Sequence, residues 1–153
     1  MKETTARPVD LARLTRAVAP GGQLAFQVPD NFDHPSHRTA EEAASREPFR
    51  SALAGAAHPR GVLAPEAYSV ILDRLGYAQQ WVRLEIYGQR LESREGTVAW
   101  VDASLLSQYR RKLPGELHGP FVDEYRRILF QRIPDERPYF FTYRRILARA
   151  ARR

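Results

Sequence analysis

Residues 20–38 read PGGQLAFQVPDNFDHPSHR, and this stretch decides the fold class. Its pair of glycines ends a short helix predicted over residues 8–18. The apolar run 24–28 that follows predicts a β-strand buried on both faces, as strands of parallel sheets are. A proline stops this strand, and the polar segment 30–38 predicts a loop.

The rest of the chain alternates between helical and extended patterns. Apolar spacing predicts helices over residues 39–53 with a break at Pro48, and over 65–75, 95–113 and 114–133. Residues 81–87 alternate and predict a strand whose better-buried face carries Val82, Leu84 and Ile86. The strand predicted over 138–148 is apolar on both faces, which is typical of the interior of a sheet. We expect residues 149–153 to fray. The order predicts an α/β fold in one domain, 1–153.

Length and composition exclude several classes of protein. The chain has 153 residues, no cysteine and no apolar run long enough to cross a membrane. No apolar segment follows the first residues, so we expect no signal peptide and a cytoplasmic location. The four histidines are His34, His37, His58 and His118. Because only the first two are close in sequence and no third ligand lies nearby, we expect no metal site.

The positive charge lies in the last third of the chain. The net charge is +6, and residues 110–153 carry 12 basic and 5 acidic side chains. Arginine outnumbers lysine 22 to 2, which fits either recognition of phosphate and carboxylate groups or a codon bias. We favour the bias. Arginine pairs stand among tyrosines and phenylalanines, as in some nucleic-acid-binding surfaces, but these aromatics fall on core positions of helix and strand. Nucleic-acid binding is therefore the least favoured interpretation.

The loop at 30–37 resembles a binding site most closely. It follows a buried strand, and ligands of open parallel sheets bind beyond the carboxyl ends of strands. Donors and acceptors in the loop come from Asp30, Asn31, His34, Ser36 and His37. The alternative is that the aspartate and asparagine only shape a turn. The residues by themselves leave both open.

The same stretch resembles a known family of enzymes. The sequence PGGQLAFQVPDNFDHPSH is similar to the region around the fifth strand of trans-aconitate methyltransferases, which are class I S-adenosylmethionine-dependent methyltransferases. Residues 63–76 (LAPEAYSVILDRLG) resemble the family's helix before the sixth strand. Val82, Arg83 and Tyr87 match a V-R-x-x-x-Y pattern in that strand, and residues 138–149 resemble the seventh. The resemblance covers residues 8–150.

This resemblance is to the second half of the family's domain only. It implies a partial Rossmann-like sheet with strands equivalent to the fifth, seventh and sixth, the last-in-sequence strand being antiparallel and central. It also implies a helical insertion at about 95–133. The G-x-G-x-G loop, which holds the cofactor in the family, is missing. Strand 24–28 would then be an unprotected edge. We expect it to pair in a homodimer or with a separately encoded N-terminal half.

By resemblance, the reaction would be methyl transfer from S-adenosylmethionine to a carboxylate of a small acid. We expect the isolated chain not to bind this cofactor tightly. A carboxylate is ionised at neutral pH, so alignment matters more than a strong base. The resemblance implies these substrate-binding residues: Asn31, His37, Arg83, Tyr87, Trp100 and Tyr109. Residues 105–108 stand where the family has G-L-R-P, so the arginine is absent and the acid stays open. The alternative is a non-catalytic remnant or interaction module that pairs through its exposed strand.

Overall fold

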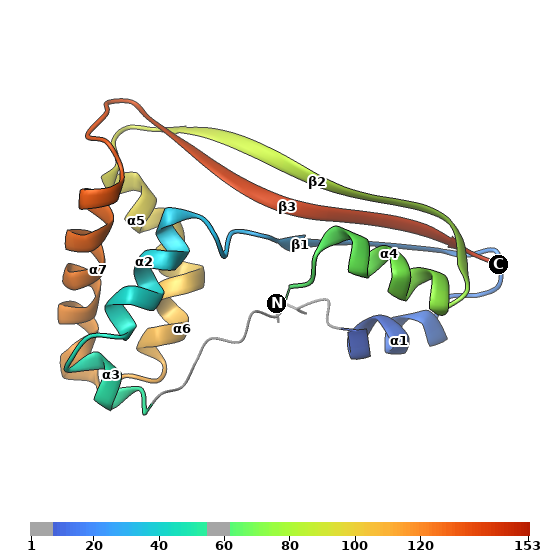
Figure 1. Ribbon diagram of the computed structural model, residues 1–153, viewed down its shortest axis with the longest axis horizontal. Helices are drawn as coiled ribbons and strands as arrows, with labels where there is room; N and C mark the ends of the chain where they lie inside the picture. The colour runs from blue at the N-terminus through green and yellow to red at the C-terminus, as the bar shows by residue number, and fades with distance from the viewer. Residues whose placement is uncertain (1–7, 55–61) are drawn as a thin grey trace. The chain divides into compact units, whose positions relative to one another are not determined.

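The computed structural model describes residues 8–54 and 62–153, so His58 lies outside the described residues. The segment 55–61, for which the sequence predicts a loop, lies outside them too. It confirms an α/β fold with one three-stranded sheet (Figure 1). The elements, in chain order, are α1 (Pro8–Arg16), β1 (Gln23–Pro29), α2 (Pro35–Ala44), α3 (Phe49–Ala52), α4 (Pro65–Arg74), β2 (Tyr77–Leu91), α5 (Glu95–Val101), the π-helical turn η1 (Asp102–Leu106), α6 (Ser107–Arg110), the 3-10 turn η2 (Gly115–Leu117), α7 (His118–Arg132) and β3 (Tyr139–Arg152).

The last strand in sequence is the central strand of the sheet. The strand order is β1-β3-β2, and β3 runs antiparallel to β1. Phe26 lies opposite Ala148, and Val28 lies opposite Ile146. The predicted position and direction of the last strand are therefore confirmed.

The described residues cluster into two compact units. The first, here called the sheet unit, contains residues 8–31, 62–87 and 143–153. The second, here called the helical unit, contains residues 32–54 and 88–142, and so includes the predicted insertion. Each unit has its own buried side chains, and each is described separately below.

Only one face of the sheet unit is covered by helices. Leu11 of α1, with Tyr68 and Leu72 of α4, packs against Val28 and Ile146 of the sheet. Both helices lie on the same side of the strands (Figure 1). This core orders the sheet by removing its apolar side chains from water.

Three predictions about the strands are wrong. β1 is buried on one face only. Leu24 and Val28 are buried against the helices and Phe26 packs partly buried on the same face, whereas the alternate residues Ala25 and Gln27 are exposed. The predicted buried face of β2 extends only to Val82, since Leu84 and Ile86 are 40% and 69% exposed. Residues 149–152 do not fray but continue β3, where the backbone N–H of Arg152 donates to the carbonyl of Gly22 at 2.8 Å.

Two helices also begin or break at unexpected places. The predicted loop ends early because α2 starts at Pro35, a residue that suits the first helical turn, and the His34 imidazole caps it. The helix predicted over 95–113 is divided by the π-helical turn η1, which carries an extra residue per hydrogen-bonded turn. Arg110 closes over this turn with two hydrogen bonds to the Asp102 carboxylate, at 2.6 and 3.0 Å.

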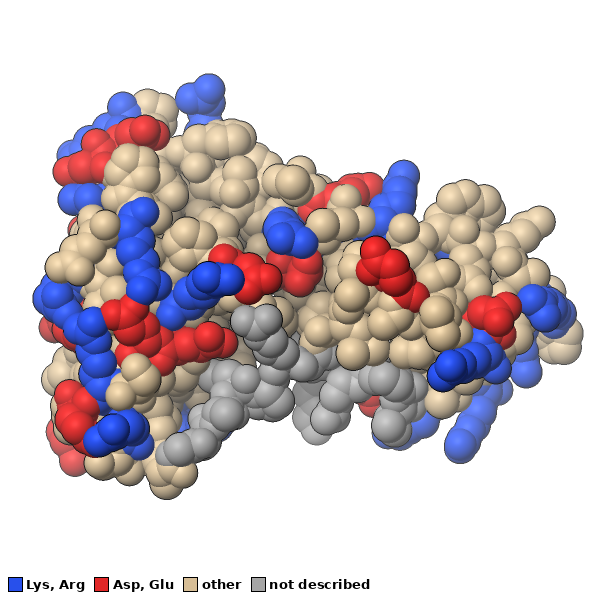
Figure 2. Space-filling model, viewed as in Figure 1, with Lys and Arg blue, Asp and Glu red and all other residues tan. Residues whose placement is uncertain are grey.

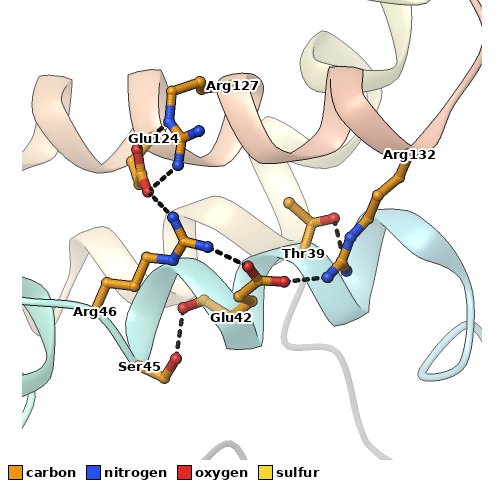
Figure 3. Close-up of polar contacts among 7 residues, drawn as sticks. All are labelled: Thr39, Glu42, Ser45, Arg46, Glu124, Arg127 and Arg132. Atoms are coloured by element: carbon orange, nitrogen blue, oxygen red, sulfur yellow. Dashed lines mark hydrogen bonds and ion pairs between the residues drawn. The ribbon is translucent and has the colours of Figure 1, made fainter.

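In the helical unit, α2 packs against α7 through a chain of ion pairs (Figure 3). Arg46, which follows the end of α2, lies between the carboxylates of Glu42 and Glu124, and its Nη1 is 2.8 Å from Glu124 Oε1. Arg127 also contacts Glu124 at 2.8 Å, and Arg132 contacts Glu42. Acidic and basic side chains are interspersed over this unit (Figure 2). Much of the basic charge of the last third is therefore paired locally.

Glu124→Gln tests this network. Hydrogen bonds from Arg127 and Arg46 lower the pKa of Glu124 to about 2. Because the pair contacts water, we expect the substitution to cost only about 0.5 to 1 kcal/mol at pH 7. The carboxylate stabilises the fold above its ordinary pKa, so the difference should shrink as the pH falls from about 5 toward 2. Urea unfolding at pH 7 and pH 3 measures this, and a difference independent of pH would contradict it.

Candidate functional site

Asn31 and Asp30 fasten the carboxyl end of β1 to β3. The side-chain oxygen of Asn31 accepts a hydrogen bond from the backbone N–H of Arg144 at 2.7 Å. The Asp30 carboxylate accepts one from the Arg144 guanidinium at 2.9 Å. Both side chains therefore have a structural role at this strand end, which is contact with β3 rather than the shaping of a turn. Ligand contact by Asn31 stays a prediction.

Substitution of Asn31 separates the two roles. Asn31→Ala leaves the backbone N–H of Arg144 without its partner, so we expect a loss of about 1 to 2 kcal/mol in the free energy of unfolding. Asn31→Asp keeps an acceptor oxygen at the same place and should lose much less. Chemical denaturation of the two variants measures the difference. Equal stability of both variants and the native chain would show that this hydrogen bond is not stabilising.

A second polar group lies at the amino end of α2, in the helical unit. Ser36 is fully buried, and its hydroxyl oxygen is 2.8 Å from His34 Nδ1 and 3.1 Å from His37 Nδ1. The Ser36 backbone N–H also donates to His34 Nδ1 at 3.2 Å. A ring nitrogen that accepts this bond carries no proton, so His34 is held as a neutral imidazole. Burial lowers the pKa of His34, which favours the same form.

Aromatic rings extend this group into a cluster. The ring of Phe141 lies 5.1 Å from His34 and 5.8 Å from Trp100, measured between ring centres. His34, Ser36, His37, Trp100 and Phe141 are together called the histidine cluster. The structure thus brings together four candidates from the sequence: His34, Ser36 and His37 of the loop, and Trp100. Phe141 is the member that was not predicted, because the aromatic strand by itself does not show which ring meets this loop.

The buried imidazole makes the helical unit sensitive to acid. Because the pKa of His34 in the folded chain lies below its ordinary 6.5, the unfolded chain binds the proton first as the pH falls. The contribution of His34 to the free energy of unfolding is therefore fully present above pH 6.5 and is lost as the pH falls below it. We expect His34→Asn, which keeps a capping oxygen, to remove this part of the decline. Thermal unfolding between pH 7.5 and 5 compares the two, and parallel pH curves would contradict the assignment.

Arg83 and Tyr87 lie on β2, in the sheet unit, and share one carboxylate. Arg83 forms an ion pair with Glu85 at 3.2 Å, and the Tyr87 hydroxyl donates to Glu85 at 3.0 Å. This hydrogen bond raises the pKa of Tyr87. The Tyr87 ring stacks on Tyr143, with ring centres 5.2 Å apart. Sequence reasoning missed Glu85, although residues two apart on a strand point to the same face.

Tyr109 belongs to the core of the helical unit. Its side chain is 3% exposed, and its ring centre is 5.1 Å from that of Phe121. Burial raises the pKa of its hydroxyl well above the ordinary value. A contact between Tyr109 and a substrate stays a prediction.

The residues present do not fit a cofactor of the S-adenosylmethionine type. The chain contains no G-x-G-x-G sequence. The polar groups at the carboxyl end of β1 are already bonded to Arg144. Within residues 8–54 and 62–153, no three His, Asp or Glu side chains converge as metal ligands, and no helix is long and apolar enough to span a bilayer.

Comparison with known proteins gives the ancestry of the chain. No family model matches it. It is 37% identical over 148 residues to the trans-aconitate 2-methyltransferase of Deinococcus radiodurans, which is 93% of this chain and 56% of that protein. It is 38% identical over 136 residues to the trans-aconitate 2-methyltransferase of Streptomyces avermitilis, covering 88% of this chain and 50% of that protein. The chain is a relative of the C-terminal part of trans-aconitate 2-methyltransferases.

The match to these methyltransferases covers most of this chain but only about half of each relative. A further trans-aconitate 2-methyltransferase, from Acidovorax sp. strain JS42, is 37% identical over 119 residues, 74% of this chain and 44% of that protein. The chain thus spans about half the length of the curated relatives it matches. The fold, the histidine cluster and the β2 residues all lie within a region of methyltransferase ancestry.

Proposed function

We propose that this chain is the substrate-side half of an S-adenosylmethionine-dependent methyltransferase of the trans-aconitate type. One observation carries the proposal: the similarity runs through nearly the whole chain and covers about half of each relative, its C-terminal part. The sheet order β1-β3-β2, with an antiparallel central strand, is consistent with strands equivalent to the fifth, seventh and sixth of the Rossmann-like methyltransferase sheet.

The substrate class follows from the relatives and from the chemistry on the chain. A small carboxylic acid is already ionised at neutral pH, so the protein has to orient it rather than remove a proton. Two separate pairs of residues could do so: Arg83 and Tyr87 within the sheet unit, or His37 and Trp100 within the helical unit. Ser107 stands where the family's G-L-R-P motif has its arginine, so we leave the particular acid open.

Another polypeptide region must provide the cofactor-binding site, because the residues of this chain do not fit the cofactor. We propose that a polypeptide region similar to the N-terminal part of the relatives supplies the cofactor site. This region pairs with the free edge of β1, either in the same polypeptide or as a separate chain. A homodimer through β1 is the other arrangement that would satisfy this edge.

A methyl-transfer assay tests the proposed function. The chain is co-expressed with the N-terminal part of the Deinococcus radiodurans relative and incubated with S-adenosylmethionine and trans-aconitate. Mass spectrometry then measures the methyl ester. We expect ester from the co-expressed pair and none from either part alone. His37→Ala should lower the rate at least about tenfold if it contacts the acid, whereas Val70→Ala, on the exposed surface of α4, should not.

The second candidate is a non-catalytic interaction module. The missing cofactor loop and the open edge of β1 favour it for the chain by itself. In the assay above, a stable pair that forms no ester with any small di- or tricarboxylic acid would support this function and contradict the first.

A further inference from the structure

The face of the sheet away from α1 and α4 is open in the sheet unit. Side chains from all three strands line a groove of about 580 Å³ on this face, here called the outer groove. Its lining residues are Ala25, Phe26, Gln27, Trp81, Arg83, Leu147, Ala148 and Arg149. Trp81 is 53% exposed, which is unusual for so large an apolar side chain in a folded domain. An exposed groove of this kind is typical of an interface.

The charged side chains that line the outer groove are both basic, Arg83 and Arg149. Arg83 forms an ion pair with Glu85 of its own strand at 3.2 Å. The Arg149 guanidinium lies 5.4 Å from the centre of the Trp81 ring, and its Nε donates to the Gln23 side chain at 3.0 Å. These contacts hold the Arg149 guanidinium over the aromatic ring, where its positive charge can meet a carboxylate of a partner. The groove therefore suits an apolar segment that carries acidic side chains.

The open face continues into an open edge. β1 pairs with β3 along its whole length, from Gln23 to Pro29. Within the part of the chain that the structure describes, no strand pairs with the other edge of β1. A partner that adds a strand at this edge can also place its next element over the outer groove, as sheets of α/β proteins are covered on both faces.

Two occupants could cover this surface, and the charge decides between them. A second copy related by a twofold axis would place groove on groove, because such an interface uses the same patch on both subunits. Arg149 would then approach its own copy, with no carboxylate among the residues that line the groove. The relatives, in contrast, carry an N-terminal part of similar length that this chain does not match.

We infer that the outer groove and the free edge of β1 are the docking surface for a polypeptide similar to the N-terminal part of trans-aconitate 2-methyltransferases. This inference rests on the proposed function and names the surface by which the two halves join. Trp81 is the central apolar contact, and Arg149 pairs with an acidic side chain of the partner. The same surface serves whether that region belongs to the same polypeptide or to a separate one.

Sedimentation of the co-expressed pair tests the surface. The chain is produced together with the N-terminal part of the Deinococcus radiodurans relative, and the pair is measured by analytical ultracentrifugation. We expect a one-to-one complex. Trp81→Glu and Arg149→Glu, each on the exposed groove, should weaken it at least about tenfold. The matched controls Val70→Glu and Arg74→Glu lie on the exposed side of α4 and should leave it unchanged.

Three results would overturn the inference. The pair does not form, or it forms equally well with Trp81→Glu and Arg149→Glu, or the chain alone dimerises and Trp81→Glu makes it monomeric. Salt-dependent binding of a DNA duplex that Arg149→Glu removes would assign the groove to nucleic acid and would also overturn it. The proposed function is tested separately. A complex that is weakened by Trp81→Glu but makes no methyl ester would support the docking surface and contradict the proposed function. Equal amounts of ester from the native pair and from the Trp81→Glu pair would support the proposed function and contradict the docking surface.

Discussion

Tyr68→Ala should lower the free energy of unfolding by about 3 to 5 kcal/mol, the range for removing a large buried side chain. Tyr68 is fully buried between α4 and the sheet, and its ring packs edge-on against Phe26 with centres 5.5 Å apart. Its hydroxyl accepts a hydrogen bond from the Leu63 backbone N–H at 3.3 Å. Truncation would therefore leave a cavity and an unpaired N–H group in the sheet unit.

Tyr68→Phe is the matched control for this effect. It keeps the ring against Phe26 and removes only the acceptor, so we expect a loss of about 1 kcal/mol. Urea denaturation of both variants gives the difference. Similar losses for the two substitutions would mean that the hydrogen bond, not the packed ring, stabilises the sheet unit.

Phe121→Ala should have a comparable effect on the helical unit, again about 3 to 5 kcal/mol. Phe121 lies on α7 and is fully buried. Its ring centre is 5.2 Å from Phe49 and 5.1 Å from Tyr109, so three segments of the unit meet at this residue. Loss of the ring removes contacts with α3 and α6 at once.

Phe121→Leu keeps an apolar side chain of moderate size and should lose clearly less than Phe121→Ala. Hydrogen exchange followed by mass spectrometry shows where the fold loosens. We expect faster exchange in α7 and α3 for Phe121→Ala, and in α4 and β1 for Tyr68→Ala. Uniform loosening of the whole chain in both variants would show that the two units unfold as one.

The sequence allowed the elements to be predicted better than their surroundings. Helix α4 begins at the predicted residue because Pro65 suits a first turn and Tyr68, Ile71 and Leu72 recur on one face. β1 was recognised as a strand, but its burial was not, because an apolar run does not reveal which face the helices cover. Ala25 is small enough to be exposed at little cost, and Gln27 was read as part of the run.

The candidate site was predictable only in part. Asn31 and His37 were identified because polar residues follow a strand, but Arg144 and Phe141 were not assigned to these neighbourhoods. Those contacts depend on how β3 aligns with residues more than a hundred positions earlier, which no local pattern encodes. The π-helical turn in the predicted insertion could not be predicted either, because the spacing of Val98, Val101 and Leu105 fits a continuous helix equally well.

Titration of S-adenosylhomocysteine by calorimetry tests the central claim most directly. We propose that this chain is the substrate-side half of a methyltransferase and that the cofactor site belongs to another polypeptide region. We therefore expect no heat of binding with the chain alone and one site per complex with the co-expressed N-terminal part of the Deinococcus radiodurans relative. Binding to the chain alone at one site per chain, or a stable complex that binds none, would contradict it.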